Sequence, residues 1–553
     1  MIRSRRSILA GATVLWLAMP AALASAAAPL VESPAGTLRG EALEAVNAFR
    51  GIPYAQAPTG ALRWRPPVAV RPWSGVRDAT RFGPACHQPP SRPESIYAPA
   101  QVPAMSEDCL SLNVWTPAEA GKAVEPAPVF VWIHGGALSA GMASDPMYDG
   151  ARLAAQGVVA VTINYRLGVL GYLAHPQLSE ESDEGVSGNY GLLDQIQALR
   201  WVQENIAAFG GDPGNVTIAG ESAGALSVMY LMAAPPAHGL FHEAIAQSAY
   251  MISTPALRET VHGTPSAEAS GLALSRTVGV RGLPRLRAMD AQALTVQAAV
   301  SGFMPLANVD GKVLPAQPVA VFDRGEQAKV PILAGFNEGE IRSLRFLLPP
   351  QPADAAAYEA EIGSRYGELA DAMLQRYPAT GLDEAMLATT RDAMYGWTAE
   401  RLVRRQTALG QPSFLYYFDH GYPDADAKGL HAFHAAEIPY ALGTAAGTPP
   451  HWPAIPDTDA EKRLSTAMLG YWVSFARDGV PAAAGFPEWR AYGDSRAYMA
   501  FDGEPRPGEQ LMPGMFELVE EVVCRRRAQG DLPWHWNVGI VAPPLPAGAA
   551  GCR

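Results

Sequence analysis

Short apolar runs alternate along the middle of this chain with a segment of helical periodicity. Residues 128–133 and 158–164 are nearly continuous apolar stretches, as expected of strands that are covered on both faces. Residues 192–208 instead place apolar side chains three or four positions apart, which is typical of an amphipathic helix. A glycine-rich turn at 210–214 leads from that helix into another apolar run at 216–219. This order predicts a mostly parallel central sheet flanked by helices.

The N-terminal part of the chain has the alternating pattern of antiparallel strands. Residues 30–49 alternate apolar and polar positions around a turn at Gly36, which predicts a hairpin. Residues 50–60 are broken by prolines and glycines and predict an irregular loop. Residues 107–116 then predict a further strand.

Toward the C-terminus, residues 330–335 and 414–418 are two more apolar runs that predict buried strands. The segments 254–327 and 345–411 are rich in alanine and leucine and have helical periodicity. We therefore expect them to form lid-like helical insertions into an α/β domain.

A serine flanked by glycines stands where the strand at 216–219 meets the next helix. The sequence there is Gly-Glu-Ser-Ala-Gly, with Ser222 at its centre. Such a turn holds the serine in a strained conformation, and larger residues in place of the glycines would collide with the neighbouring strand or helix. The turn also sets the serine at a helix N-terminus, where free N–H groups stabilise an anion. Ser222 is therefore a candidate nucleophile, with a chance pentapeptide in a chain of 53 glycines as the competing interpretation.

A glycine pair follows the strand at 128–133. His134, Gly135 and Gly136 come directly after it, and glycines at a strand end let backbone N–H groups approach a ligand closely. An oxyanion hole needs such N–H groups, although a simple loop after a strand has the same composition.

A serine nucleophile needs a base that takes its proton and a third group that orients the base. Glu338 and Glu340 follow the strand at 330–335, and His431 and His434 lie a short loop beyond the strand at 414–418. The order serine, acid, histidine is the order of the α/β-hydrolase fold. The residues alone leave open which glutamate and which histidine take part.

The chain resembles the type-B carboxylesterase and cholinesterase family of α/β-hydrolases. Besides the segments at 134–136 and 220–224, the resemblance rests on four stretches in family order, Arg-Gly-Ile-Pro-Tyr-Ala from 50, Glu-Asp-Cys-Leu-Ser-Leu-Asn-Val from 107, Gly-Asn-Tyr-Gly-Leu-Leu-Asp-Gln from 188, and Asn-Ile-Ala-Ala-Phe-Gly-Gly-Asp-Pro from 205. It spans residues 49–502. It implies a single α/β-hydrolase catalytic domain over residues 29–541.

The resemblance implies a role for each candidate residue. Ser222 is then the nucleophile, Glu340 the acid and His434 the base of a Ser-His-Glu triad. The oxyanion hole would be formed by the amides of Gly135, Gly136 and Ala223. Glu338 and His431 remain the alternatives for acid and base. Glu221 and Glu437 are expected to be buried structural carboxylates.

The implied activity is hydrolysis of small-molecule carboxylic esters through an acyl-enzyme. A lipase, a lactonase or an amidase would use the same triad, and a cholinesterase-like binding protein would lack catalysis. Cholinesterases of this family hold the choline ammonium with a tryptophan in the first cysteine loop, where this chain has Tyr97 and no tryptophan. A quaternary ammonium substrate is therefore not supported, although Tyr97 is a weaker cation-π partner.

Neither a cofactor nor a metal is expected. His431 and His434 could form a metal pair on one helical face, but no cysteine or carboxylate cluster accompanies them at ligand spacing. The net charge of −12 argues against nucleic acid or an anionic membrane as a partner. A hydrophobic content of 48% in 553 residues indicates a large globular core.

The first residues predict export. Arginines precede an apolar run and a series of small residues over 1–28, the order of a cleaved signal peptide, and the segment at 4–9 also resembles a twin-arginine signal. A membrane anchor is the alternative interpretation. No other stretch is apolar enough to span a bilayer, so the mature protein is expected to be periplasmic or secreted, without stable membrane insertion.

Four cysteines are compatible with such an oxidising compartment. Cys86 and Cys109 bracket a proline-rich loop, and Cys524 and Cys552 bracket the C-terminal part of the chain. Three pairings are possible, and we favour the two local disulfides over free thiols or crossed pairs. The Pro/Gly/Ala tail at 542–553 is expected to be mobile apart from Cys552.

Overall fold

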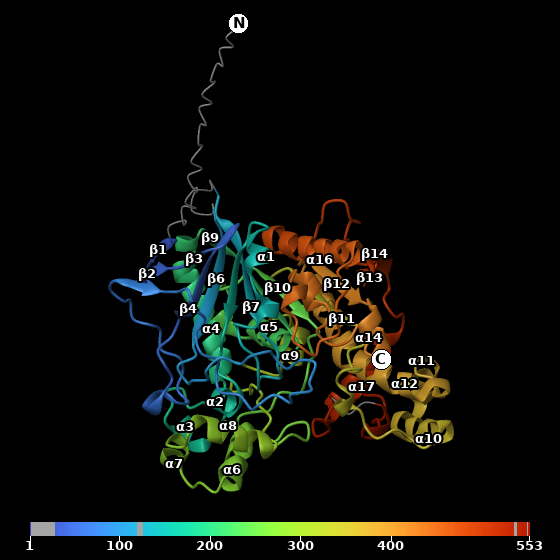
Figure 1. Ribbon diagram of the computed structural model, residues 1–553. Coiled ribbons are helices and arrows are strands. Elements are labelled where there is room, and N and C mark those ends of the chain that lie inside the picture. The colour runs from blue at the N-terminus through green and yellow to red at the C-terminus, as the bar shows by residue number, and fades with distance from the viewer. Residues whose placement is uncertain (2–27, 119–124, 536–538, 550, 553) are drawn as a thin grey trace.

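A large twisted sheet runs through the molecule and carries the rest of the chain on its two faces (Figure 1). The computed structural model describes residues 1, 28–118, 125–535, 539–549 and 551–552. Within these residues the large sheet has 11 strands. Their order across the sheet is β14 (Glu504–Glu509), β13 (Ala497–Asp502), β12 (Ser413–Phe418), β11 (Ile332–Asn337), β10 (Glu243–Gln247), β9 (Gly211–Glu221), β7 (Ala127–Ile133), β8 (Val159–Ile163), β6 (Ser111–Pro117), β4 (Val46–Pro53) and β3 (Glu41–Ala42).

The middle of this sheet is parallel and its two ends are antiparallel. All neighbours from β8 through β13 pair in parallel. The pairs β13–β14, β8–β6, β6–β4 and β4–β3 are antiparallel. The predicted α/β-hydrolase architecture, with a mostly parallel centre, is thus confirmed, and the carboxyl ends of the parallel strands meet at one edge.

The central strands are buried on both faces, as their apolar runs predicted. In β7, Val129, Val131 and Ile133 join the core on one face, whereas Phe130 and Trp132 join the core on the other. The first core also contains side chains of α4 (Tyr190–Asn205), α5 (Ala223–Ala233) and α13 (Trp397–Ala408). The second contains those of α16 (Asp459–Asp478). Alternation along a strand therefore sorts neighbouring residues into two separate cores.

Both segments with helical periodicity form groups of helices. The first contains α6 (Ala267–Thr277), α7 (Leu283–Arg287), α8 (Ala291–Val300) and α9 (Pro318–Arg324). The second contains α10 (Ala355–Tyr366), α11 (Ala370–Arg376), α12 (Leu382–Arg391) and α13. Figure 1 shows α6 to α8 grouped at one end of the molecule and α10 to α12 at one side. Each of these two groups has a small apolar core of its own.

The other helices and a second, small sheet complete the fold. The remaining helices are α1 (Ala151–Ala154), α2 (Gly168–Tyr172), α3 (Pro176–Glu180), α14 (Pro423–Ala427), α15 (Ile438–Ala441) and α17 (Met515–Gln529). A small sheet of β1 (Leu30–Ser33), β2 (Gly36–Arg39) and β5 (Val76–Asp78) contains the predicted hairpin, whose strands pair antiparallel. No described helix has the length and apolarity needed to cross a bilayer.

The loop predicted at residues 50–60 begins later than expected. Strand β4 continues through Pro53, with a shift of register between Phe49 and Ile52. Gly51 lies within this shift at φ 66°, and its N–H donates to Asn113 Oδ1 at 2.9 Å. A β-bulge accommodates the residues whose composition predicted the end of the strand. At the bulge, a glycine in the left-handed region and a side-chain acceptor replace the regular backbone hydrogen bonds between the strands.

The structure contains two disulfides, Cys86–Cys109 and Cys524–Cys552. Two residues of the described part of the tail contact the body of the protein. Ala542 is fully buried, and the N–H of Leu545 donates to the carbonyl of Arg365 in α10 at 2.7 Å. Composition missed these contacts because they depend on the position of α10, far away in the sequence. The predicted signal peptide lies almost wholly outside the described residues.

Candidate active site

The turn from β9 to α5 has the tight geometry that its glycines predicted. Ser222, between the two elements, has φ 55° and ψ −121°, a strained conformation for a residue with a side chain. A Cβ on Gly224 would lie 2.0 Å from the carbonyl oxygen of Ile133 in β7, and one on Gly220 would lie 2.6 Å from the carbonyl carbon of Gly224. Only glycines fit at these two positions. The N–H of Ser222 donates to the carbonyl of Gln247 at 2.9 Å, which fixes the turn against β10.

The glycine pair after β7 lies directly beside this serine. A Cβ built on Gly135 would be 3.3 Å from Cβ of Ser222. Gly136 follows with φ 98°, which turns the chain back at the end of the strand. Ala223 is the first residue of α5, so its N–H has no acceptor within the helix. No described residue accepts a hydrogen bond from the amides of Gly135, Gly136 or Ala223. These are the three amides that the resemblance assigns to an oxyanion hole.

The acid and the histidine predicted from the resemblance are in direct contact. Glu340 follows β11, His434 follows β12, and the two loops pair where the N–H of Gly339 donates to the carbonyl of Ala432 at 2.8 Å. His434 Nδ1 donates a hydrogen bond to Glu340 Oε2. The other oxygen of Glu340 accepts from the N–H of Asn337 at 2.9 Å. Glu340 is fully buried, so these hydrogen bonds hold its carboxylate group in one orientation.

The second nitrogen of His434 faces the turn that carries Ser222. His434 Nε2 lies 3.1 Å from Oε1 of Glu221, the residue before the serine. The imidazole therefore lies between Glu340 on one side and the nucleophile turn on the other. The ring of Tyr395 packs against it, with ring centroids 5.3 Å apart.

Three buried carboxylates set the charge of this site. Burial alone would lower the pKa of His434, but Glu221, Glu340 and Glu437 together raise it to about 9. Burial raises the pKa of Glu221 to about 8, against the opposing effect of His434. Burial also raises the pKa of Glu437, whose oxygens accept hydrogen bonds from Gln247 at 2.9 Å and Asn337 at 2.6 Å. The histidine thus lies among three carboxyl groups, and burial disfavours the charged form of two of them, Glu221 and Glu437.

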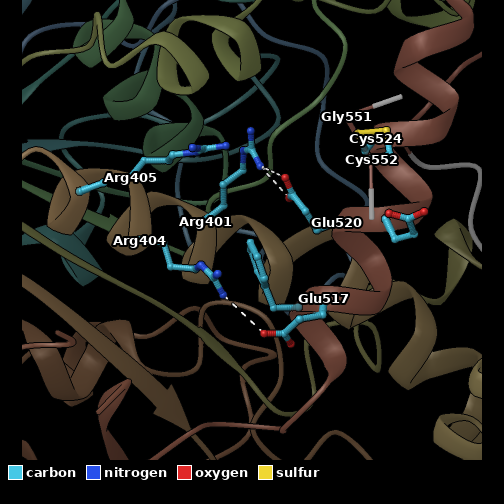
Figure 2. Close-up of a pocket in the computed structure, with 11 residues that line it drawn as sticks. Arg401, Arg404, Arg405, Glu517, Glu520, Cys524, Gly551 and Cys552 are labelled. Carbon is cyan, nitrogen blue, oxygen red and sulfur yellow. Dashed lines mark hydrogen bonds and ion pairs between the residues drawn. A yellow bond between two sulfur atoms is a disulfide. The ribbon is translucent and has the colours of Figure 1, made fainter. Parts of the chain in front are cut away.

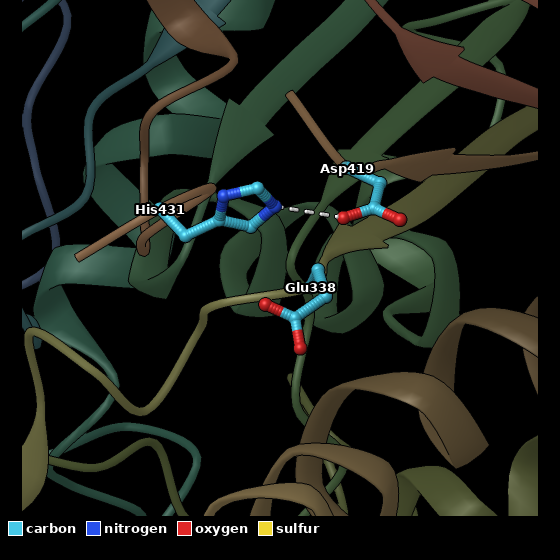
Figure 3. A group of neighbouring side chains, drawn as sticks. All are labelled: Glu338, Asp419 and His431. Carbon is cyan, nitrogen blue, oxygen red and sulfur yellow. Dashed lines mark hydrogen bonds and ion pairs between the residues drawn. The ribbon is translucent and has the colours of Figure 1, made fainter. Parts of the chain in front are cut away.

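The alternative residues, Glu338 and His431, lie near each other and near Asp419 (Figure 3). His431 Nε2 bonds Asp419 Oδ1 at 3.0 Å, and its Nδ1 bonds Asp426 Oδ1 at 2.8 Å. Glu338 instead contacts Arg342 and Arg391. His431 and Glu338 are about 36% and 21% exposed, whereas Glu340 has no exposure. The structure therefore brings Glu340, and not Glu338, to His434.

Glu338, Asp419 and His431 also have the atoms of a possible metal site. One ligand atom of each lies within 4.8 Å of the others. Both nitrogens of His431 already bond carboxylates, and hydrogen bonding to Asp419 is the main cause that raises its pKa to about 9. A protonated imidazole thus supplies the positive charge between these acids. His431 and His434, which the sequence offered as a metal pair, bond different carboxylates.

Several residues that contact the site were not singled out from the sequence. The side chains of Asn337 and Gln247 both donate hydrogen bonds to Glu437. The backbone N–H of Asn337 also donates to Glu340. The position of Asn337 and Gln247 at the last residue of β11 and β10 is the only sequence signal that could have indicated them. The hydroxyl of Tyr97 bonds the carbonyl of His434 at 2.9 Å and the hydroxyl of Ser343 at 2.7 Å.

A separate pocket of about 430 Å³ lies between α13 and α17 (Figure 2). Arginines and glutamates line it beside the disulfide Cys524–Cys552. Arg401 pairs with Glu520, and Arg404 with Glu517, so charges of opposite sign already face each other there. The pocket contains none of the candidate catalytic residues.

The sequence and the fold were compared with known proteins. Residues 27–515 match the carboxylesterase family. A fumonisin B1 esterase from Sphingopyxis macrogoltabida is 36% identical over 483 residues, which cover 84% of this chain and 85% of that protein. A para-nitrobenzyl esterase from Bacillus subtilis is 35% identical over 489 residues, with coverage of 86% and 95%. Human carboxylesterase 3 is 33% identical over 574 residues and 97% of each chain.

Solved structures have the same fold over most of this chain. A PNB esterase structure has a TM-score of 0.77 and 32% identity, and covers 89% of this chain and 99% of its own. A carboxylesterase from Geobacillus stearothermophilus has a TM-score of 0.70 and 33% identity, with coverage of 91% and 100%. Sequence and fold therefore agree along nearly the whole length of these proteins, and the chain belongs to the carboxylesterase family of carboxylic ester hydrolases.

Proposed function

We propose that this protein hydrolyses small-molecule carboxylic esters through an acyl-enzyme on Ser222. The observation that carries the proposal is the position of the His434 imidazole. Its Nδ1 donates to Glu340, and its Nε2 faces the turn on which Ser222 stands. A histidine that is oriented by a buried acid and lies beside the turn of a serine fits the arrangement that activates a hydroxyl nucleophile.

In the proposed mechanism, the Oγ of Ser222 attacks the ester carbonyl while His434 Nε2 accepts its proton. The imidazolium then gives this proton to the leaving alcohol, and the C–O bond breaks. Water then attacks the acyl carbon while His434 takes one of its protons. The bond from the acyl carbon to Ser222 Oγ breaks, the acid leaves, and His434 returns the proton to Ser222 Oγ. Glu340 keeps the neutral ring in the tautomer with the proton on Nδ1 and stabilises the charged ring.

The amides of Gly135, Gly136 and Ala223 are proposed to hold the negative oxygen of the tetrahedral intermediate. Their support is the 3.3 Å approach of the Gly135 Cβ position to Ser222 and the first position of Ala223 in α5. Such donors stabilise charge that develops only in the transition state, and one of them typically contributes a hundred- to a thousandfold in rate.

The test is ester hydrolysis by wild type and by Ser222→Ala, combined with labelling by a fluorophosphonate. We expect Ser222→Ala to lose on the order of a millionfold in kcat, and mass spectrometry to find one adduct on Ser222 of wild type. Folded wild type that hydrolyses no ester and takes up no label would instead support a binding protein without catalysis. An adduct on a different serine would refute the assigned nucleophile.

The acyl group and the scissile bond are separate questions. Nitrophenyl esters of increasing acyl length, with a matching anilide and a lactone, distinguish a carboxylesterase from a lipase, an amidase or a lactonase. We propose that esters of short acids are hydrolysed best and the anilide least. Higher kcat/KM for long acyl chains than for short ones would make the protein a lipase instead.

We further propose export with removal of a signal peptide over residues 1–28. Its charged, apolar and small-residue order supports this, and two disulfides fit an oxidising compartment. Mass spectrometry of the mature protein should find an N-terminus near Ala26 or Ala28. An intact N-terminus in exported protein would favour the membrane-anchor interpretation.

A further inference from the structure

The loop closed by Cys86–Cys109 contacts the histidine loop through Tyr97. The Tyr97 hydroxyl lies 2.9 Å from the backbone carbonyl of His434, 337 residues away in the sequence, and 2.7 Å from Ser343 Oγ. Ser343 in turn lies three residues after Glu340. One phenol oxygen therefore joins the segments that carry the proposed acid and the proposed base.

The direction of these two hydrogen bonds follows from the available protons. A carbonyl oxygen can only accept, so the single Tyr97 proton goes to His434 and the Ser343 hydroxyl donates to Tyr97. Burial raises the pKa of the Tyr97 phenol well above its usual value. The hydroxyl consequently keeps its proton, and remains a donor to His434, across the pH range in which an esterase works.

Aromatic packing fixes the position of the Tyr97 ring itself. Tyr97 meets Trp452 edge to face at a centroid distance of 6.0 Å. Trp452 in turn packs on Phe433, the residue before His434, at 4.8 Å. Such contacts restrain a ring in one orientation. The phenol is thus held where its hydroxyl meets the main chain of the base.

A second residue of the same loop holds the glycine loop. The side-chain amide of Gln88 donates to the carbonyl of Gly141 at 3.1 Å and accepts from the N–H of Gly141 at 3.0 Å. Gly141 ends the turn that begins at Gly135 and Gly136. The disulfide-closed loop therefore contacts both the proposed oxyanion loop, through Gln88 near its first cysteine, and the proposed base, through Tyr97 near its middle.

We propose that Tyr97 is a positioning residue for ester hydrolysis: its hydrogen bond to the His434 carbonyl holds the imidazole in register with Ser222. The proposal rests on the function proposed above, in which His434 is the base. His431, three positions before His434, has a positive φ. Ala435, the residue directly after His434, also has a positive φ. A backbone of this shape needs outside contacts to hold one conformation. The Tyr97 hydroxyl supplies one of them at the catalytic residue itself.

The test compares three variants that each remove one oxygen atom. Tyr97→Phe deletes the bond to His434 and leaves the ring packing. Ser343→Ala deletes the other bond of the same hydroxyl and leaves the one to His434. Tyr358→Phe is the matched control, because its buried hydroxyl also donates to a backbone carbonyl, that of Tyr377 at 3.1 Å, within the separate core of α10.

We expect Tyr97→Phe to lower kcat about ten- to a hundredfold, with KM within about twofold of wild type, because misplacement of a catalytic group affects the chemical step. Inactivation by a fluorophosphonate, which also needs the activated serine, should slow by the same factor. Ser343→Ala and Tyr358→Phe should keep kcat within about twofold. Melting temperatures of Tyr97→Phe and Tyr358→Phe should fall by similar amounts. Tyr97→Met, a second variant without the hydroxyl, should repeat the loss if the phenylalanine variant does not fold.

Two outcomes would overturn the inference. In the first, Tyr97→Phe keeps kcat within about twofold of wild type. In the second, Ser343→Ala or Tyr358→Phe loses as much kcat as Tyr97→Phe. The loss of kcat would then follow from the removal of any buried hydrogen bond. These outcomes are distinct from a failure of the proposed function, in which His434→Ala would retain full activity while wild type hydrolyses the ester.

Discussion

The imidazole of His434 lies among three buried carboxylates, and their charge sets the pH at which the base is free. Glu340 bonds Nδ1 of the ring, whereas Glu221 approaches Nε2, the nitrogen that accepts the serine proton in the proposed mechanism. A negative charge at that nitrogen stabilises the imidazolium, which is the inactive form of a general base. Glu221 therefore has an electrostatic effect on the base as well as the structural role expected from its burial.

Replacement of Glu221 should move the pH profile of the reaction. The pKa of His434 is raised to about 9, so kcat/KM of wild type should rise with pH through that region, because only the neutral ring accepts a proton. Glu221→Gln removes a carboxylate that raises this pKa, so the rise should shift to lower pH. The difference from wild type should be largest between about pH 8 and 9, where Glu221 is ionised and His434 is still protonated, and small at pH 6, where Glu221 itself is neutral.

Glu243→Gln is the matched control for this measurement. Burial raises the pKa of Glu243 to about 7, but this carboxyl lies at the far end of β10 from the serine, near Thr217. Its replacement should leave the profile in place. A profile of Glu221→Gln that coincides with wild type would show that Glu221 has no electrostatic effect on the base.

At the scale of elements, the site depends on how closely α5 packs behind β9 and β7. The two glycines of the turn are the points of closest approach, with Gly224 facing the carbonyl of Ile133. The sequence predicted this turn, its strand and its helix because the requirement is local and steric. The bulge in β4 and the contacts of the tail were not predicted, because their stabilising partners, Asn113 and Arg365, are distant in the sequence.

Two glycine-to-alanine changes should have opposite effects on stability. A Cβ at position 224 would be 2.0 Å from a backbone oxygen that cannot move away, so Gly224→Ala should lower the free energy of unfolding by about 3 kcal/mol or more and abolish ester hydrolysis. Gly363, exposed in α10, has nothing within 4 Å of the corresponding position. Gly363→Ala should raise stability by about 0.5–1 kcal/mol. Chemical denaturation monitored by circular dichroism measures both, and a well-folded, active Gly224→Ala would refute the packing argument.

Over the whole molecule, the two disulfides close very different parts of the chain. Cys86–Cys109 closes the loop that contacts the glycine loop and the histidine loop, whereas Cys524–Cys552 ties the end of the chain to α17. The second disulfide lies at the pocket between α13 and α17, away from the candidate catalytic residues (Figure 2). Their loss should therefore have different consequences.

Cys524→Ser with Cys552→Ser should release the tail without loss of catalysis. Limited proteolysis within residues 539–549 should accelerate about tenfold or more, because local opening governs cleavage, while kcat stays within about twofold of wild type. Cys86→Ser with Cys109→Ser should instead lower kcat, because the loop that holds the site becomes free to move. Equal kcat losses in the two double variants would contradict this division.

The sequence by itself determined the parts of this protein that depend on neighbours along the chain. Apolar runs, helical periodicity and the glycines around Ser222 predicted the sheet, its helices and the nucleophile turn, because burial and steric fit act over a few residues. Only the tertiary structure decided which acid meets which histidine. Glu340 and His434 contact each other, whereas Glu338 and His431 contact other partners, and these contacts depend on how the loops after β11 and β12 pack together. The bond from Tyr97 to His434 is of the same kind, since packing alone brings together residues 337 positions apart.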